Sequence, residues 1–95
     1  MPAYAIALVD VTDAEKYLQY SKLAGPATAQ YGGTFVVRGV VDSVIEGKAP
    51  YSRVVVVEFP TVEAAKAFYA SPEYEAARAK RKYAADFNML IVQGT

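Results

Sequence analysis

The 95-residue chain has the length of one domain, residues 1–95, and its ten basic residues balance its ten acidic residues. Nucleic-acid-binding proteins normally carry a basic excess, so we expect no nucleic-acid partner. The absence of cysteine and histidine excludes disulfides, thiolate and imidazole catalysis, and the usual zinc and haem ligands. We therefore expect neither a metal nor another cofactor.

The chain opens with a strand over residues 3–9, which is apolar on both faces and so belongs inside the fold. This run is too short to span a membrane and lacks the basic start of a signal peptide. We expect a cytoplasmic protein with no membrane partner. Residues 14–30 follow with helical spacing. Pro26 either kinks that helix or begins a second segment, and Gly32-Gly33 ends it.

The second and third strands cover residues 34–41 and 52–59, and the polar loop 42–50 joins them in a wide hairpin. Both strands are rich in valine, a residue that favours extended structure. Gly39 interrupts the first of them. This glycine predicts either a β-bulge or a close approach of another backbone segment.

Two short helices and a last strand complete the chain. Residues 62–70 form the first of these helices, with Thr61 as its N-cap. Ser71 caps the second, which begins with a proline at its first position and runs over about 72–83. Residues 86–93 form the last strand.

The element order is β-α-β-β-α-β, which is the split βαβ pattern of ferredoxin-like folds. We predict an α+β domain in which a four-stranded antiparallel sheet carries both helices on one face. The other face would be bare, yet residues 54–57 and 90–92 are apolar on both sides. A second copy of the sheet covers such a face most simply, so we expect a homodimer. A monomer with a loop over the bare face is the alternative.

Five short motifs are spread over nearly the whole chain. They are Tyr31-Gly32-Gly33, Arg38-Gly39, Glu46-Gly47, Glu58-Phe59-Pro60, and Ser71-Pro72-Glu73-Tyr74 followed by Arg81. Their order and spacing resemble the domain of unknown function 1330 family. The resemblance implies a dimeric α/β barrel of the ferredoxin-like superfamily, but no particular activity. That superfamily includes cofactor-free monooxygenases, haem-dependent enzymes and small-molecule isomerases. The chain departs from the family pattern at Val40 and Phe68, where members commonly have glycine and tryptophan.

Arg38 and Glu58 are charged residues inside otherwise apolar strands. A hairpin centred near residue 47 would place them diagonally on one face of the sheet. One interpretation is a structural ion pair. In the other, Arg38 binds an anionic group such as a carboxylate, and Glu58 orients it or acts as a general base. Arg53 has the opposite parity and is expected at the rim.

The eight tyrosines either fill the core and interface or line a pocket between helices and sheet. Tyr20, Tyr69 and Tyr74 are the candidate pocket residues. Arg81 shares a helix face with Tyr74 and either points into the cavity mouth or forms a surface salt bridge. Glu46 stands in the hairpin loop, where it would lie at a pocket lip if the loop reaches across the dimer.

Two functions from different classes fit these residues. The first is the binding of a small anionic or oxygenated apolar molecule in a pocket of the dimeric barrel. The superfamily resemblance extends this function to cofactor-free isomerase or oxygenase-type chemistry. The second is a non-catalytic dimeric structural or interaction module. A roomy cavity that exposes Arg38 and Glu58 would favour the first function, and a filled interior would favour the second.

Overall fold

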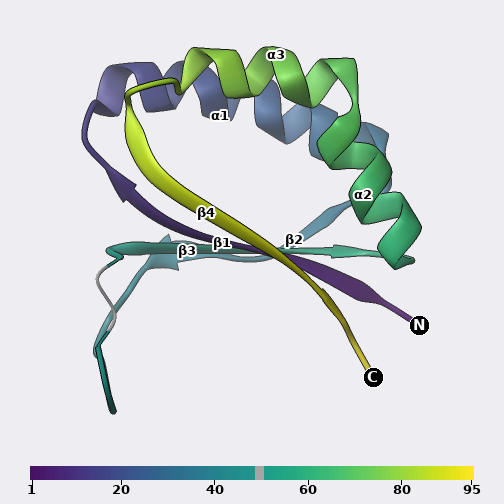
Figure 1. The fold of residues 1–95 in the computed structure, drawn as a ribbon, viewed down its shortest axis with the longest axis horizontal. Helices are drawn as coiled ribbons and strands as arrows, with labels where there is room; N and C mark the ends of the chain where they lie inside the picture. The colour runs from purple at the N-terminus through teal and green to yellow at the C-terminus, as the bar shows by residue number, and fades with distance from the viewer. Residues whose placement is uncertain (49–50) are drawn as a thin grey trace.

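The structure is a computed structural model that describes residues 1–48 and 51–95. Its elements follow in the order β1 (Ala3–Val11), α1 (Ala14–Gln30), β2 (Thr34–Val40), β3 (Arg53–Phe59), α2 (Val62–Ala70), α3 (Pro72–Lys80) and β4 (Ala85–Gln93). The strands form one antiparallel sheet in the order β2-β3-β1-β4. All helices cover the same face of this sheet (Figure 1). The predicted ferredoxin-like α+β fold is confirmed. The last two residues of the predicted loop 42–50 lie outside the described residues.

The element bounds lie within two residues of the sequence predictions except at the end of α3. Helix α1 is continuous and contains Pro26 within it, so this proline starts no separate segment. Helix α3 ends at Lys80, earlier than predicted, with Arg81 as its C-cap, and Tyr83 in the following turn adopts a left-handed φ of 63°. Among the described residues, no helix has the length and apolar character needed to cross a membrane.

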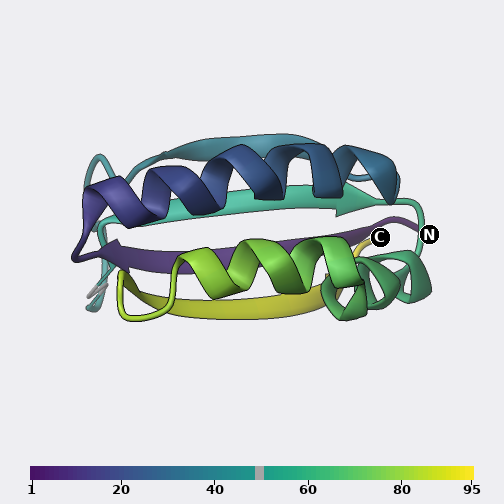
Figure 2. The same ribbon diagram turned by 90° about the horizontal axis from the view of Figure 1, so that it is seen from above.

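The helix-facing side of the central strand β1 carries small side chains. Ala3, Ala5 and Ala7 are buried there, and Val9 completes the stripe. The bulk of the core comes instead from aromatic residues of the neighbouring elements, which pack with ring centroids 4.4–5.2 Å apart in the series Phe59, Phe68 and Tyr74. Helices α1 and α3 lie side by side above the sheet (Figure 2). Small residues below and rings above leave room between the two layers.

The opposite face of the sheet is apolar and bare of helices. Ile6 stands at its centre, between Val56 of β3 and Leu90 of β4. Val37 continues this row on β2. Leu90 remains 53% exposed in the single chain. The segment that follows β2 extends away from the helices, on the side of this bare face (Figure 1).

A β-bulge in β2 changes which residues share a face. Thr34 pairs with Glu58, but the register shifts by one between Phe35 and Val37, so Arg38 pairs with Val55. Because a one-residue shift moves every later side chain to the other face, Arg38 points to the helix side and Glu58 to the bare side. The predicted diagonal pairing of Arg38 with Glu58 on one face is therefore wrong.

Candidate functional site

A cavity of about 70 Å³ lies between the helix-facing side of the sheet and the helices. Ala5 and Ala7 of β1 form part of its floor, and Phe68 and Met89 contribute apolar walls. The room exists because the central strand carries only methyl groups under the helices. The cavity is thus apolar along most of its lining.

Two arginines from neighbouring strands line this cavity, Arg38 of β2 and Arg53 of β3. Arg53 pairs with Val40, two residues from Arg38, which makes the arginines diagonal neighbours on one face. The Arg38 guanidinium carbon lies 4.0 Å from the ring centroid of Phe35, and that of Arg53 lies 5.5 Å from the ring of Tyr17. Within the described chain, no Asp or Glu lines the cavity.

Three tyrosines, together with Ser21 and Thr28, add polar groups to the lining. The hydroxyl oxygens of Tyr20 and Tyr74 share a buried hydrogen bond at 2.6 Å, and the ring of Tyr17 lies 5.2 Å from that of Tyr20. Burial, followed by the neighbouring Tyr74 hydroxyl, raises the pKa of Tyr20. Burial also raises the pKa of Tyr17, although the Arg53 charge opposes this rise. Both hydroxyls therefore stay protonated at neutral pH and can donate hydrogen bonds to an anionic oxygen.

A second, more open hollow of about 420 Å³ adjoins the cavity at the edge formed by β4. Tyr69 of α2 and Arg81, which follows α3, line it together with Ile91. Phe87 and Met89 line both hollows. The Arg81 guanidinium carbon lies 3.8 Å from the ring centroid of Phe87, so this arginine stacks on a side chain that lines both the cavity and the hollow.

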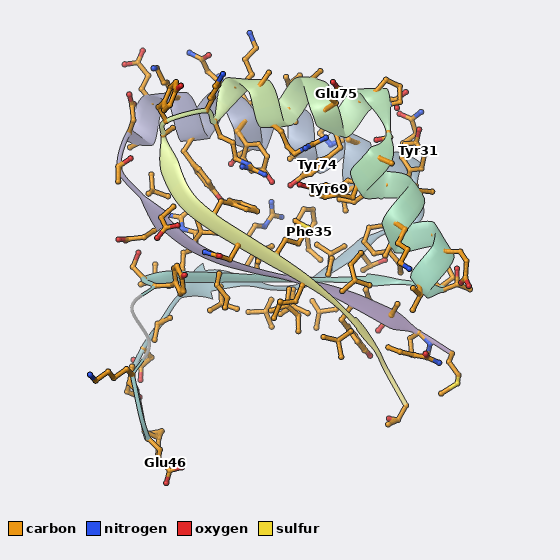
Figure 3. All side chains as sticks on the ribbon, in the orientation of Figure 1. Tyr31, Phe35, Glu46, Tyr69, Tyr74 and Glu75 are labelled. Atoms are coloured by element: carbon orange, nitrogen blue, oxygen red, sulfur yellow. The ribbon has the colours of Figure 1, made fainter. Side chains whose placement is uncertain are left out.

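The structure distributes the candidate residues over three places. Arg38, Tyr20 and Tyr74 line the cavity, and Tyr69 and Arg81 line the adjoining hollow. Figure 3 shows the labelled Phe35, Tyr69 and Tyr74 between the helices and the sheet, whereas Glu46 lies on the far side of the sheet. Glu58 also lies on the bare face, where it raises the pKa of the Tyr4 hydroxyl through its charge.

Arg53 and Tyr17 line the cavity, but neither was predicted from the sequence as a candidate site residue. The prediction that Arg53 lies on the opposite face from Arg38 is wrong, because both line the cavity. The signal was present in β3 itself, where Arg53 alternates with the buried Val57 and Phe59. Only the bulge in β2 brings Arg38 onto that same face.

The arrangement suits the binding of an anionic oxygen more than the removal of a proton. Guanidinium groups and protonated phenols donate hydrogen bonds, and the lining within the described chain contains no carboxylate that would act as a base. In residues 1–48 and 51–95, no cluster of three or more potential metal-binding side chains of the His, Cys, Asp and Glu types occurs. The polar groups would thus hold a ligand directly.

Several solved structures share this fold. A protein of unknown function from Rhodopseudomonas palustris is 25% identical, with a TM-score of 0.79 over 99% of this chain and 82% of that one. A dimeric ferredoxin-like protein of unknown function from Jannaschia sp. CCS1 is 10% identical, with a TM-score of 0.79 over 99% and 100% of the two chains. SnoaB, a cofactor-independent oxygenase from Streptomyces nogalater, is 10% identical, with a TM-score of 0.71 over 99% and 93%.

None of the curated proteins matches the chain. Solved structures of 10–25% identity show the fold, whereas a match to a family along almost the whole sequence shows the family. The family described as domain of unknown function (DUF1330) matches residues 2–95, and the chain therefore belongs to the DUF1330 family.

Proposed function

We propose that the protein binds a small, mainly apolar molecule that carries an anionic oxygen group. The observation that carries this proposal is the pair Arg38 and Arg53, which lie diagonally on one face and line a cavity without a carboxylate in the described chain. Like charges on neighbouring strands repel each other. An anionic ligand would relieve this repulsion, and each guanidinium offers a fork of donors that matches a carboxylate.

The cavity also limits the rest of the ligand. Its walls are methyl groups and aromatic rings, which favour an apolar body. Its volume of about 70 Å³ is well below the range of roughly 300–1,000 Å³ typical of drug-sized pockets. A single ring or a short chain fits the enclosed part, with its acidic group toward Arg38 and Arg53.

Thermal unfolding with matched ligands tests this proposal. Benzoate, cinnamate and 2-hydroxybenzoate at millimolar concentrations should raise the melting temperature, because a ligand that binds only the folded state stabilises it. The neutral benzamide and cinnamamide should not. The Arg38→Gln/Arg53→Gln double variant should lose the response, whereas Lys66→Gln, at an exposed site on α2, should keep it.

Equal responses to acids and amides would refute the arginine site. If no ligand of the series shifts the melting temperature, the binding proposal fails and the non-catalytic module gains support. The double variant should fold normally in buffer, since it removes two like charges at exposed or half-buried positions.

A homodimer through the bare face of the sheet is part of the same proposal. Ile6, Val56 and Leu90 form an apolar row there that a single chain leaves uncovered, and contiguous apolar patches of this kind mark interaction sites. The Jannaschia protein with the same fold is described as dimeric. A second copy would present an identical row about a two-fold axis.

Light scattering with two matched variants tests the dimer. The chain has a mass of 10.3 kDa, and twice this mass is expected in solution. Leu90→Asp on the bare face should give the single-chain mass. Leu18→Asp on α1 is the matched control and should keep the doubled mass. The two leucines are similarly exposed in the single chain, Leu18 at 55% and Leu90 at 53%. A native protein of single-chain mass at micromolar concentration would rule out the dimer.

Cofactor-free isomerase or oxygenase-type chemistry is a second candidate, favoured by the Tyr20 and Tyr74 hydroxyl pair. Both reaction types pass through an enolate, whose oxygen such preorganised donors would stabilise. The fold shared with SnoaB is compatible with this chemistry. With no base in the described lining, the substrate proton would pass to solvent hydroxide.

Proton exchange tests the catalytic candidate apart from binding. In deuterated water, the protein should accelerate deuterium uptake at the carbon next to the carbonyl of a cyclic ketone, as followed by NMR. Tyr20→Phe should slow this uptake. Tyr51→Phe, at an exposed site outside the cavity, should leave it unchanged. An uptake rate equal to that in buffer would remove this candidate.

A further inference from the structure

The cavity and the adjoining hollow are neighbours on the helix-facing side of the sheet, because Phe87 and Met89 line both, and together they are called the groove. The groove runs from β2 to β4, which are the two edge strands. Three strand spacings separate these edges, or roughly 14 Å. Arg38 stands at the β2 edge and Arg81 at the β4 edge, so a guanidinium group marks each end.

Arg81 is held in place at its end of the groove. Its guanidinium carbon lies 3.8 Å from the ring of Phe87 and 5.1 Å from that of Tyr20. Stacking on these rings fixes the plane of the fork. The Arg81 Nε is buried and has no hydrogen-bond partner within the described chain. Among the described residues, this nitrogen is therefore a free donor at the end of a partly exposed guanidinium group.

The surroundings of Arg81 add donors and no negative charge. The Tyr69 hydroxyl lines the same hollow and accepts a long hydrogen bond of 3.4 Å from Arg78 Nη1. The Nε of Arg78 is likewise buried and without a partner in the described chain. Arg81 thus lines this end directly and Arg78 contacts its Tyr69 wall, while the described lining of the hollow has no carboxylate.

The middle of the groove is apolar and aromatic. Phe87 and Met89 line both parts of the groove where they meet, and the ring of Tyr20 lies 5.8 Å from that of Phe87. A ligand that reaches from one end to the other must therefore have an apolar central part. A single acidic group would leave one end of the groove unpaired.

Resting on the proposed function, we infer that the ligand is an extended molecule with an acidic group at each end and an apolar middle. Arg38 and Arg53 hold one acid and Arg81 holds the other. The more open hollow of about 420 Å³ takes the end that projects toward solvent. This assigns to Arg81 a binding role that depends on the second acidic group alone.

Calorimetric titration with a matched ligand pair tests the inference. Cinnamate carries one acid, and 4-carboxycinnamate carries a second acid at the far end of the same skeleton. The native protein should bind the diacid at least about tenfold more tightly, which is the effect of about 1.4 kcal/mol expected from one added charge-assisted contact. Arg81→Gln should abolish this preference, so that the ratio of the two affinities falls to about one.

Two further variants separate charge from folding effects. Arg81→Lys retains the charge and should keep part of the diacid preference, while Lys80→Gln, at an exposed position on α3, should keep all of it. Equal affinities of the native protein for the two ligands would overturn the inference but leave the proposed function intact. An Arg81→Gln variant whose affinities for both ligands fall by the same factor would also overturn the inference, because Arg81 would then contact the single acid of cinnamate. If neither ligand binds, the proposed function and this inference fail together.

Discussion

The buried hydroxyl pair of Tyr20 and Tyr74 allows a quantitative test of how the cavity is held together. The two oxygens lie 2.6 Å apart, and the residues are 7% and 1% exposed. They join α1 to α3 across the top of the cavity. Removing either hydroxyl breaks the hydrogen bond and leaves its partner buried among aromatic rings without that contact.

The expected magnitudes follow from this geometry. Leaving one buried hydroxyl unsatisfied costs about 1–3 kcal/mol, so each single variant, Tyr20→Phe or Tyr74→Phe, should lose this much free energy of unfolding. Replacing both hydroxyls leaves no orphaned group, so the double variant should lose no more than one single variant does. The coupling energy from the double-mutant cycle should therefore be at least as large as one single loss, about 1–3 kcal/mol.

Urea unfolding at one fixed protein concentration measures these values, since a dimer makes apparent stability depend on concentration. Tyr51→Phe is the matched control. Its hydroxyl accepts a 2.8 Å hydrogen bond from the Asn88 amide at an exposed site, so its loss should change stability by less than about 0.5 kcal/mol. Additive losses for Tyr20 and Tyr74 would refute the reasoning, because they would show that the hydroxyls act independently.

Four further changes have defined expectations, each measured by thermal or urea unfolding. Gly33→Ala should cost about 1–3 kcal/mol through overpacking, because the new Cβ would lie 2.9 Å from the buried Phe59 ring. Gly25→Ala, with nothing within 4 Å of its Cβ, should instead stabilise α1 by up to about 1 kcal/mol. Ser71→Ala should cost about 1–2 kcal/mol, since its buried hydroxyl caps both the end of α2 and the start of α3. The backbone amide at Glu73 and a tyrosine hydroxyl lower the pKa of this carboxyl. Its stabilising effect is therefore present above the ordinary value of 4.5 and disappears as the pH falls through the folded-state pKa. Glu73→Gln should unfold more easily at neutral pH and equal the native protein in acid. Equal stability of the two at neutral pH would contradict this assignment.

The sequence predicted the fold well because its strongest signals are local. The break between α2 and α3 follows from the side-chain cap and proline at residues 71–72, and the structure places it there. The sheet was predictable because valine runs and helical spacing alternate in an order with one common topology. These features depend on neighbours along the chain and need no knowledge of packing.

The candidate site was predictable only in part, because it depends on register. Gly39 was the visible signal for a bulge, yet it pairs regularly with Val54, and the shift occurs between Phe35 and Val37. No residue type marks that position. Arg38 and the tyrosines stand out in the sequence as residues, but the grouping of Arg38 with Arg53 appears only once the bulge is placed.

The alanines of β1 make the central strand a size filter for whatever enters the cavity. Ala5 and Ala7 are 3% exposed and lie under the helices, where valine would bury two more methyl-sized groups, each contributing about 0.8 kcal/mol. The chain leaves that stabilisation unused and keeps a hollow instead. Enlarging either side chain should stiffen the domain while excluding ligands. In the proposed site, the alanines of β1 would limit ligand bulk and the arginines of β2 and β3 would select ligand charge, so the two properties could be altered one at a time.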